Sequence, residues 1–229
     1  MNHEMKPITI DFPLMGEWMA PNTPQTKVPS HGTDLFGETY AIDLLQVDWG
    51  RPGTPFYDVS VPHYLLFGVP LSRCYAWGQP IYVPFDGQVL IAADGITERK
   101  RVHWLTDLIV ALRNARSVRL GSADPKNFAG NYVIMQYAED VYAAFVHMQN
   151  GSVCVKPGQF VKKGEQLGRI GHSGNSMAPH LHFQLMDNSD AAYAKGLPFV
   201  FHEYEVLHES EWVKVTRSLP SEKDRIRAL

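Results

Sequence analysis

The sequence of 229 residues has only two cysteines, Cys74 and Cys154, and no CxxC pair. This scarcity excludes a disulfide framework, a redox pair and a zinc site built from cysteines. We expect both cysteines to be buried as small hydrophobic residues. No apolar run approaches the ~18 residues of a membrane-spanning helix, and the N-terminal segment carries acidic residues where a signal peptide has an apolar run. We therefore expect no membrane span and, from this chain alone, a cytoplasmic location.

A surplus of positive charge is also missing. The 21 Lys and Arg residues are outnumbered by 24 Asp and Glu residues, which gives a formal net charge of -3. Because proteins that neutralise nucleic-acid phosphates normally carry excess basic residues, we expect no nucleic-acid partner. Hydrophobic residues make up 45% of the chain, enough for a sizeable core. One globular domain with an insertion, or two small domains, is expected.

The distribution of apolar residues predicts a mainly β fold. From residue 39 onward, short runs rich in Val, Ile, Tyr and Phe alternate with Gly, Pro and Asp. Residues 131–138 and 141–148 are separated only by Glu139 and Asp140 and predict an antiparallel hairpin. We predict a β domain over residues 39–205, preceded by a proline-rich extended arm over residues 1–38 and followed by a tail over residues 206–229.

One stretch has helical periodicity instead. In residues 103–116, apolar side chains recur at helical spacing, and this pattern predicts one amphipathic helix. The helix lies within a predicted insertion at about residues 94–130. We expect the insertion to cover one side of the sheet or a groove, with aromatic residues such as Trp104 used for packing.

Residues 180–185 alternate between polar and apolar side chains. Successive side chains of a strand point to opposite faces, so His180 and His182 share one face with Gln184, and the intervening apolar residues enter the core. Two imidazoles one strand repeat apart would let one bind a metal while the other reaches a metal-bound water or a substrate oxygen. Taken alone, this pattern also fits two surface histidines.

Asp43 interrupts an otherwise apolar stretch, residues 40–45. Burying an unpaired carboxylate is costly, so Asp43 must reach solvent, accept hydrogen bonds or coordinate a cation. The loop residue His31 could fold back beside it, although Asp34 is nearer to His31 in the sequence. His147 falls at the end of the second strand of the predicted hairpin. Each of these residues has an ordinary structural interpretation when it is considered singly.

In their order along the chain, these elements resemble the lysostaphin-type family of zinc metallopeptidases, which cut peptide bonds in bacterial cell-wall peptidoglycan. The resemblance covers roughly residues 31–190 and is most specific over residues 131–185, where a Gly-x-x-Gly-Asn-Ser run leads into Pro-His-Leu-His-Phe. His31 and Asp43 are twelve positions apart, a wider separation than the family's usual pattern. The resemblance implies a small antiparallel sheet or barrel-like core of the duplicated hybrid motif type, here with one inserted helix.

The resemblance also implies roles for five residues. His31, Asp43 and His182 would bind Zn²⁺ and leave a fourth position for water, as in a catalytic site. His147 and His180 would stay free of the metal, and an imidazole of pKa ~6.5 suits a zinc-bound water whose pKa is lowered to ~7. His180 is favoured as the general base because it shares a strand with His182. His147 would then orient the water or stabilise an oxyanion, but the sequence does not decide between these roles.

The predicted function is therefore that of a zinc-dependent endopeptidase acting on a peptide or on peptidoglycan, in a family whose substrate lies outside the cytoplasm. Asp43 is preferred to Asp34 as a ligand because of its apolar strand context. The HExxH helix of other zinc peptidases is absent from the sequence. Of the remaining histidines, His172 is the one most expected to line the groove. Its walls, which set substrate preference, are expected from the insertion and from the residues after Asp187.

Two alternatives stay open. A degenerate relative would bind wall peptides without cutting them. A carrier or binding module of the hammerhead type is the other alternative, because the Val and Gly rhythm of residues 155–168 also resembles biotinyl and lipoyl carrier domains. No turn with the flanking residues of such carriers presents a lysine for attachment, and the sequence leaves the oligomeric state undetermined.

Overall fold

The computed structural model describes residues 6–120, 122 and 124–228. Within this part, strands predominate over helices, and the main sheet contains 12 strands. The mainly β prediction is confirmed. No helix in these residues is long and apolar enough to cross a membrane.

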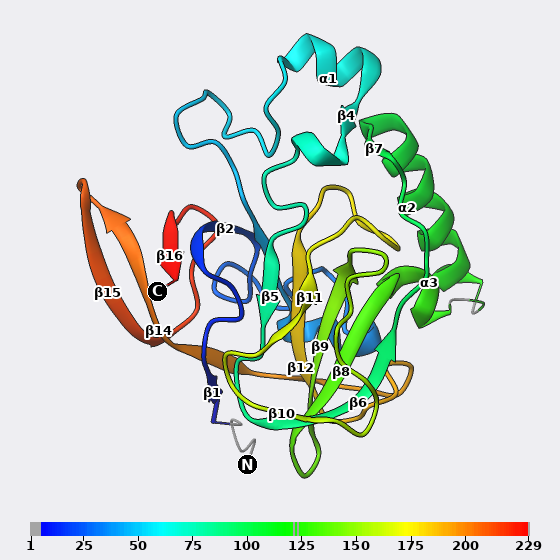
Figure 1. Ribbon diagram of the computed structural model, residues 1–229, viewed down its shortest axis with the longest axis vertical. Helices are drawn as coiled ribbons and strands as arrows, with labels where there is room; N and C mark the ends of the chain where they lie inside the picture. Colours follow the sequence, from blue (N-terminus) through cyan, green and yellow to red (C-terminus); the bar gives the residue numbers. More distant parts are fainter. Residues whose placement is uncertain (1–5, 121, 123, 229) are drawn as a thin grey trace.

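Short strands joined by a few helices make up the chain (Figure 1). In order, the elements are β1 (Ile8–Ile10), β2 (Gly16–Asn22), the 3-10 helix η1 (Leu35–Tyr40), β3 (Ile42–Leu45), α1 (Val61–Phe67), β4 (Val69–Pro70), η2 (Leu71–Arg73), β5 (Pro80–Tyr82), β6 (Gly87–Ala93), β7 (Arg101–Val102), α2 (Trp104–Arg119), α3 (Pro125–Ala129), β8 (Asn131–Ala138), β9 (Val141–Met148), β10 (Phe160–Val161), β11 (Gln166–Arg169), β12 (Leu181–Met186), β13 (Gly196–Leu197), β14 (Phe199–His208), β15 (Glu211–Ser218) and β16 (Ile226–Ala228).

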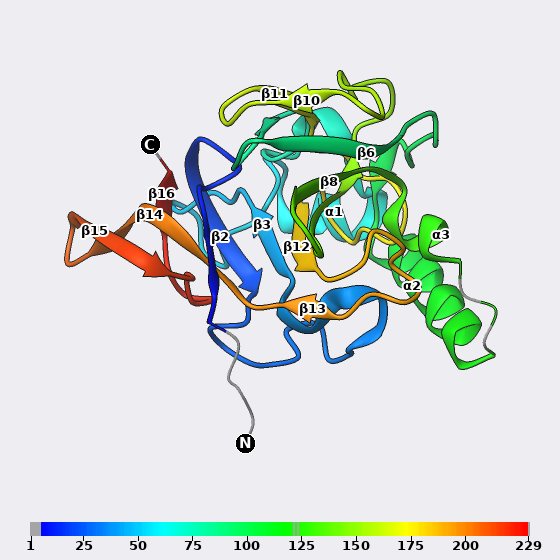
Figure 2. The same ribbon diagram turned by 90° about the horizontal axis from the view of Figure 1, so that it is seen from below.

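The main sheet has the strand order β1-β14-β16-β2-β3-β12-β9-β8-β6-β10. In addition, β13 pairs with β12 and β15 pairs with β14. The β1–β14 pair is parallel, and the other pairs along this path are antiparallel. The β14–β15 hairpin lies at one side of the molecule, and α2 and α3 lie at the opposite side (Figures 1 and 2). The strands β3, β12 and β9 are therefore in the middle of the sheet.

The alternation predicted for residues 180–185 is present in β12. Leu181, Phe183 and Leu185 have no exposed surface and belong to the main core. The ring of Phe183 lies 5.1 Å from that of Phe145 on β9 and 5.2 Å from that of Phe199 on β14. Burial of each such side chain stabilises the fold by about 1.5–3 kcal/mol. This packing fixes which face of β12 points away from the core.

The predicted hairpin is confirmed as β8 and β9, with the predicted bounds. Its turn lacks the glycine that such turns favour. Asp140 takes the left-handed conformation instead, with a φ of 54°. Asp tolerates this region better than most residues do, which explains how the Glu139-Asp140 pair closes the turn.

The stretch expected to be an extended arm is part of the sheet. Among the described residues of the range 1–38, β1 pairs with β14, and β2 pairs with both β3 and β16. Trp18 on β2 is only 1% exposed. Of the prolines in this range only Pro21 lies inside a strand, at the point where the register between β2 and β3 shifts. A proline, which cannot donate a ladder hydrogen bond, is tolerated at such an irregularity. The predicted arm's first five residues lie outside the described part.

The expected tail over residues 206–229 is also structured in its described part. It contains the end of β14 together with β15 and β16. Both strands pair with β14, and β16 continues to β2. Residues 211–218 form one strand of an antiparallel pair, although their sequence lacks a strict alternation and the strand was not predicted.

The predicted helix is confirmed as α2, but its packing is the reverse of the expectation. Trp104, Leu108 and Leu112 are 42%, 40% and 61% exposed. The inward side of α2 carries two polar residues, Asp107, which is bound by Arg99, and Asn114, which donates to Asn175, together with the smaller apolar residues that line the groove, Ala111, Ala115 and Val118. The helix is thus attached to the domain through polar contacts.

The two cysteines differ in their surroundings. Cys74 is buried, as expected, and burial raises the pKa of its thiol to about 12. Cys154 is exposed, which corrects the expectation that both would be core residues. It lies in a loop between β9 and β10, and its Sγ atom is 3.0 Å from the Gln166 carbonyl oxygen.

Candidate functional site

The five residues singled out from the sequence converge at one groove in the middle of the sheet. Asp43 on β3 is the direct register partner of His182 on β12, and β9 on the other side of β12 supplies His147. All five side chains line a cavity of about 1060 Å³. The structure thus brings all five residues together, although His31 and His182 are 151 positions apart in the sequence.

Asp43 is the centre of the polar contacts. Its Oδ2 atom lies 3.0 Å from His31 Nε2 and accepts a 2.7 Å hydrogen bond from the Asn22 amide. Its Oδ1 atom lies 3.0 Å from His182 Nδ1 and 3.3 Å from His180 Nε2. Burial by itself raises the pKa of the carboxyl, but the His180 charge and the imidazole hydrogen bonds outweigh it. The pKa of Asp43 is therefore held well below 3.8, and the group is ionised at neutral pH.

The two other residues expected as ligands, His182 and His31, are each oriented by a hydrogen bond on the ring nitrogen that points away from Asp43. Nε2 of His182 donates a 3.0 Å hydrogen bond to Gln184 Oε1, and the Gln184 amide in turn donates to the Phe36 carbonyl. Nδ1 of His31 lies 3.0 Å from Ser30 Oγ. Burial lowers the pKa of His182, but the hydrogen bond to Asp43 outweighs it and raises the pKa to about 9. Both rings thus turn one nitrogen toward the carboxylate.

His147 reaches the groove through a β-bulge. Phe145 pairs with Val133, and Met148 pairs with Asn131. Between these two pairs β9 therefore contains one more residue than β8. In a regular strand His147 would share the core face of Phe145. The extra residue reverses this direction, and His147 takes a φ of 64°. Such backbone strain costs about 1–3 kcal/mol and is concentrated at functional sites.

His147 and His180 are oriented alike. Nδ1–H of His147 donates to the Ser173 carbonyl at 2.9 Å, and Nδ1–H of His180 donates to the Ala178 carbonyl at 2.7 Å. Because Nδ1 of His147 carries a proton, its Nε2 is left as the nitrogen that can accept one, whereas Nε2 of His180 points at Asp43 Oδ1. Burial, followed by the charges of His180 and His182, holds the pKa of His147 well below 6.5. The His147 imidazole is therefore neutral at pH 7.

Two groups of donor atoms could hold a metal ion. One is His31, Asp43 and His182; the other is His147, His180 and His182, and in each group the donor atoms lie within 4.8 Å of one another. A tetrahedral zinc ion with bonds of about 2.0–2.2 Å holds its ligands about 3.3 Å apart, so small side-chain movements suffice. The first group pairs an ionised carboxylate with two imidazoles, a donor set that suits zinc.

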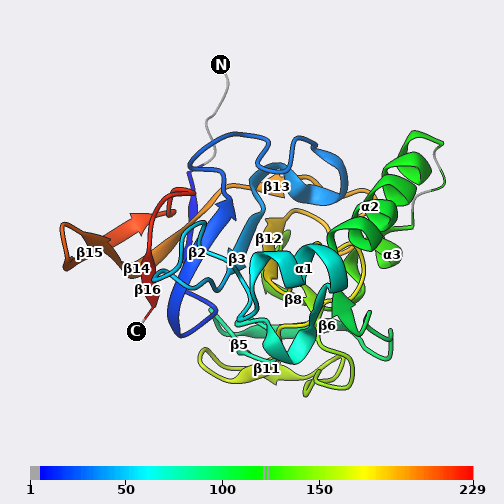
Figure 3. The ribbon, with the colours of Figure 1, turned by 90° about the horizontal axis from the view of Figure 1, so that it is seen from above.

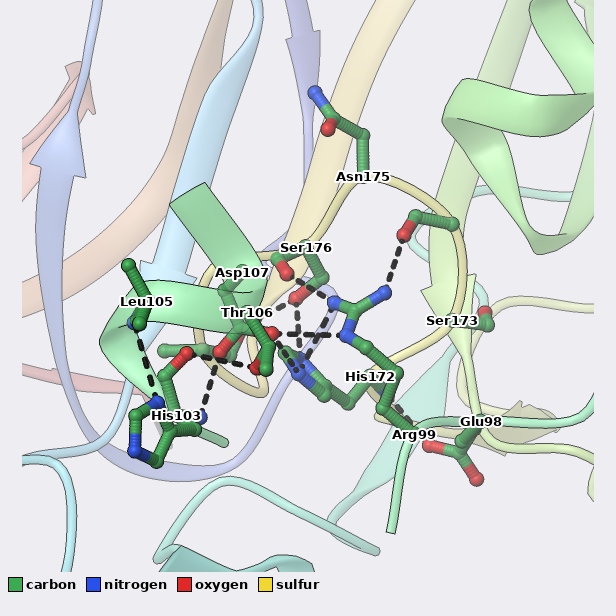
Figure 4. Close-up of polar contacts among 12 residues, drawn as sticks. Glu98, Arg99, His103, Leu105, Thr106, Asp107, His172, Ser173, Asn175 and Ser176 are labelled. Carbon is green, nitrogen blue, oxygen red and sulfur yellow. Dashed lines mark hydrogen bonds and ion pairs between the residues drawn. The ribbon is translucent and has the colours of Figure 1, made fainter. Parts of the chain in front are cut away.

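A buried polar cluster joins the insertion to the loop that carries His180 (Figure 4). Arg99 Nε donates to Asp107 Oδ1 at 2.9 Å, and the guanidinium also donates to the Gly174 and Ser176 carbonyls at 3.0 and 2.5 Å. The same guanidinium lies 3.1 Å from His172 Nε2. His172 has no exposed surface, so the expectation that it lines the groove is wrong.

A known family of proteins matches the half of the chain that holds most of this site. Residues 74–193, just over half of the sequence, match the model of peptidase family M23. The chain belongs to this family. The resemblance to zinc metallopeptidases of the lysostaphin type is thereby confirmed at the level of the family. The M23 match includes His147, His180 and His182, but it begins after His31 and Asp43.

Individual relatives of this M23 chain match over short segments. The peptidoglycan DD-endopeptidase ShyA of Vibrio cholerae is 36% identical over 59 residues, which cover 26% of this chain and 13% of ShyA. The cell division protein DipM of Caulobacter vibrioides is 41% identical over 56 residues, which cover 24% of this chain and 9% of DipM. The matched segments are thus a small part of either relative's length.

Among solved structures, the catalytic domain of lysostaphin from Staphylococcus simulans aligns with 80% of this chain and 88% of its own. The sequence identity is 16% and the TM-score is 0.39.

The sequence of this M23 chain gave little indication of the residues that support the site through hydrogen bonds. Asn22 and Ser30 lie in the range expected to be an arm, and neither has a motif of its own. Gln184 had a signal, because it shares a strand face with His182. Arg99 had none, since its partners Asp107 and Ser176 are 8 and 77 residues away in the sequence.

Proposed function

We propose that this chain is a zinc-dependent endopeptidase that hydrolyses peptide bonds in bacterial cell-wall peptidoglycan or in related peptides. The observation that carries the proposal is the convergence of Asp43 with His31 and His182 at one groove, with two further imidazoles beside them. Membership of a peptidase family supports the same class of reaction. The name of the relative ShyA supports peptidoglycan as the substrate class.

In this proposal, His31 and His182 bind zinc together with the Asp43 carboxylate. Zinc, when bound, would act as a Lewis acid and lower the pKa of a bound water to about 7. Asp43 contributes the negative charge that favours a divalent cation in a buried place. The bonds from His182 to Gln184 and from His31 to Ser30 keep the ligating nitrogens pointed at the site.

His147 and His180 handle the proton in this proposal. Each holds its Nδ1–H on a backbone carbonyl, so each offers Nε2 as the base. One Nε2 removes the proton of the attacking water, and it then returns a proton to the leaving amine as an imidazolium. The other imidazole takes up a proton from solvent and then donates a hydrogen bond from Nε2–H to the developing oxyanion. The depressed pKa of His147 and the position of His180 next to Asp43 leave the assignment of these two roles to experiment.

The walls of the groove come from the segments expected to set substrate preference. The insertion supplies Ala111, Ala115 and Val118 from α2 together with residues of α3, and residues 189–192 supply a further part of the lining. Both are connecting segments attached to a rigid sheet, as is usual for specificity elements. We propose that they select the peptide.

Metal analysis combined with a hydrolysis assay tests the proposal. We expect the purified chain to carry about one zinc ion, and a chelator to abolish the release of peptides from purified peptidoglycan, with zinc restoring it. Mass spectrometry of the released fragments identifies the bond that is cut. A chain that binds zinc and peptidoglycan fragments but releases no product would be a non-catalytic relative. A chain with no zinc affinity would contradict the proposed site.

Replacing Gln184 with leucine should weaken zinc binding without removing a ligand. Gln184 accepts the Nε2–H of His182, and loss of such a partner typically reduces metal affinity about 10–100-fold. Competition with a chromogenic chelator measures this Kd. The exposed Gln166→Leu variant on β11 is the control and should retain the original affinity. An unchanged Kd in Gln184→Leu would remove Gln184 from the proposed support of the site.

A further inference from the structure

Helix α2 presents its apolar side to solvent. Leu105, Leu108, Ile109 and Leu112 are 45%, 40%, 56% and 61% exposed, whereas Asp107 on the inward side is buried. A surface helix normally buries its apolar stripe and exposes its polar one. Here the polar side faces the domain, so the apolar side is left without a partner among the residues that the structure describes.

The end of α1 enlarges this surface. Trp104, at the start of α2, donates its indole N–H to the Leu65 carbonyl at 3.1 Å, and Arg101 donates to the Phe67 carbonyl at 2.9 Å. The strands β4 and β7 pair immediately beside these contacts. Helix α1 lies beside the beginning of α2 (Figures 1 and 3). We name the surface formed by Leu66, Phe67, Leu105, Leu108, Ile109 and Leu112 the outer patch; Leu66 and Phe67 are 70% and 60% exposed.

Positive charge accompanies the outer patch. Along α2 the spacing of Leu112, Arg116 and Arg119 places them on one side of the helix, so the apolar residues give way to arginines toward the C-terminal end. Arg113, Arg116 and Arg119 are exposed, and no carboxylate in the described part of the chain forms an ion pair with them. Residues 99–120 contain six basic residues and one acidic residue, whereas the whole chain has a net charge of -3.

We propose that the outer patch binds the surface of an anionic lipid bilayer. A helix with Trp, Leu and Ile on one exposed side and arginines beside them has the composition of helices that lie in the membrane interface. Such a helix lies in the membrane plane with its apolar side buried ~5–10 Å into the boundary between headgroups and acyl chains, where its arginines can reach the headgroups.

Charge complementarity favours lipid headgroups over a second copy of this chain. Self-association through the outer patch would bring two sets of unpaired arginines together, whereas anionic headgroups would neutralise them. Binding would also fix the position of the groove, because the inward side of α2 lines it through Ala111, Ala115 and Val118. This inference does not depend on the proposed hydrolysis and can hold if the chain is inactive.

Co-sedimentation of the full chain with vesicles tests the inference. We expect binding to vesicles of phosphatidylcholine with one third phosphatidylglycerol, weaker binding at 500 mM than at 50 mM salt, and little binding to phosphatidylcholine alone. Replacing Arg113, Arg116 and Arg119 together with glutamine should reduce the partition coefficient about 100-fold, at about fivefold for each arginine. Ile109→Glu should reduce it at least tenfold.

Matched controls keep the result specific. Phe160→Glu changes a residue that is 64% exposed on β10, outside the outer patch, and should bind like the original chain. Circular dichroism establishes that each variant is folded, and analytical ultracentrifugation without vesicles reports self-association. Failure to bind anionic vesicles, equal binding to neutral ones, or binding that the patch variants leave intact would overturn the inference. It would also be overturned if these variants abolished a dimer and not the binding to vesicles.

Discussion

His182→Ala is expected to abolish both zinc binding and hydrolysis, whereas His180→Ala is expected to abolish hydrolysis and retain about one zinc ion per chain. In the proposed site His182 is a ligand, and its loss leaves only two protein donors. His180 touches Asp43 through Nε2 but is proposed as a base, so its removal should lower kcat by about 10²–10⁴-fold. Metal content by mass spectrometry and peptide release from peptidoglycan are the two measurements.

The second donor group supplies the outcome that would contradict this assignment. His147, His180 and His182 also lie within ligand distance of one another. If they held the ion, His180→Ala and His147→Ala would lose zinc, and His31→Ala would keep it. His202→Ala is the control, because His202 is exposed on β14 and distant from the groove. It should leave both zinc content and the rate of hydrolysis unchanged.

Local periodicity was sufficient to predict the elements that carry the site. The alternation of residues 180–185 places Leu181, Phe183 and Leu185 in the core, and this arrangement alone turns His182 toward the groove. The hairpin of β8 and β9 follows from two apolar runs separated by two residues. These predictions succeed because a strand's own sequence determines which face is buried.

Features that depend on distant partners could not be predicted in this way. The bulge that turns His147 toward the groove is a mismatch between β8 and β9, and neither sequence contains it alone. The reversal of α2 has a similar origin. Its apolar residues have the spacing of a buried stripe, but Arg99 satisfies Asp107 on the opposite side and holds that side against the domain. Helical periodicity identifies an amphipathic helix and does not say which side meets the protein.

Arg99→Met should destabilise the fold by about 3 kcal/mol, because it leaves Asp107 buried without its cationic partner. The side chain of Asp107 has no exposed surface, and its other oxygen accepts from the His103 backbone N–H at the start of α2. The substitution also removes the donors to the Gly174 and Ser176 carbonyls. Denaturant unfolding monitored by circular dichroism measures the change in the free energy of unfolding.

An exposed ion pair of the same chemistry is the matched control. Arg73 Nε donates to Asp58 Oδ1 at 2.6 Å, but the two side chains are 49% and 45% exposed. Surface pairs of this kind contribute about 0–1 kcal/mol, so Arg73→Met should change stability little. The double variant Arg99→Met with Asp107→Leu should recover part of the lost stability, because replacing both members of a buried pair costs less than orphaning one. Equal effects of Arg99→Met and Arg73→Met would mean that solvent reaches Asp107 and that the insertion is not held by this pair.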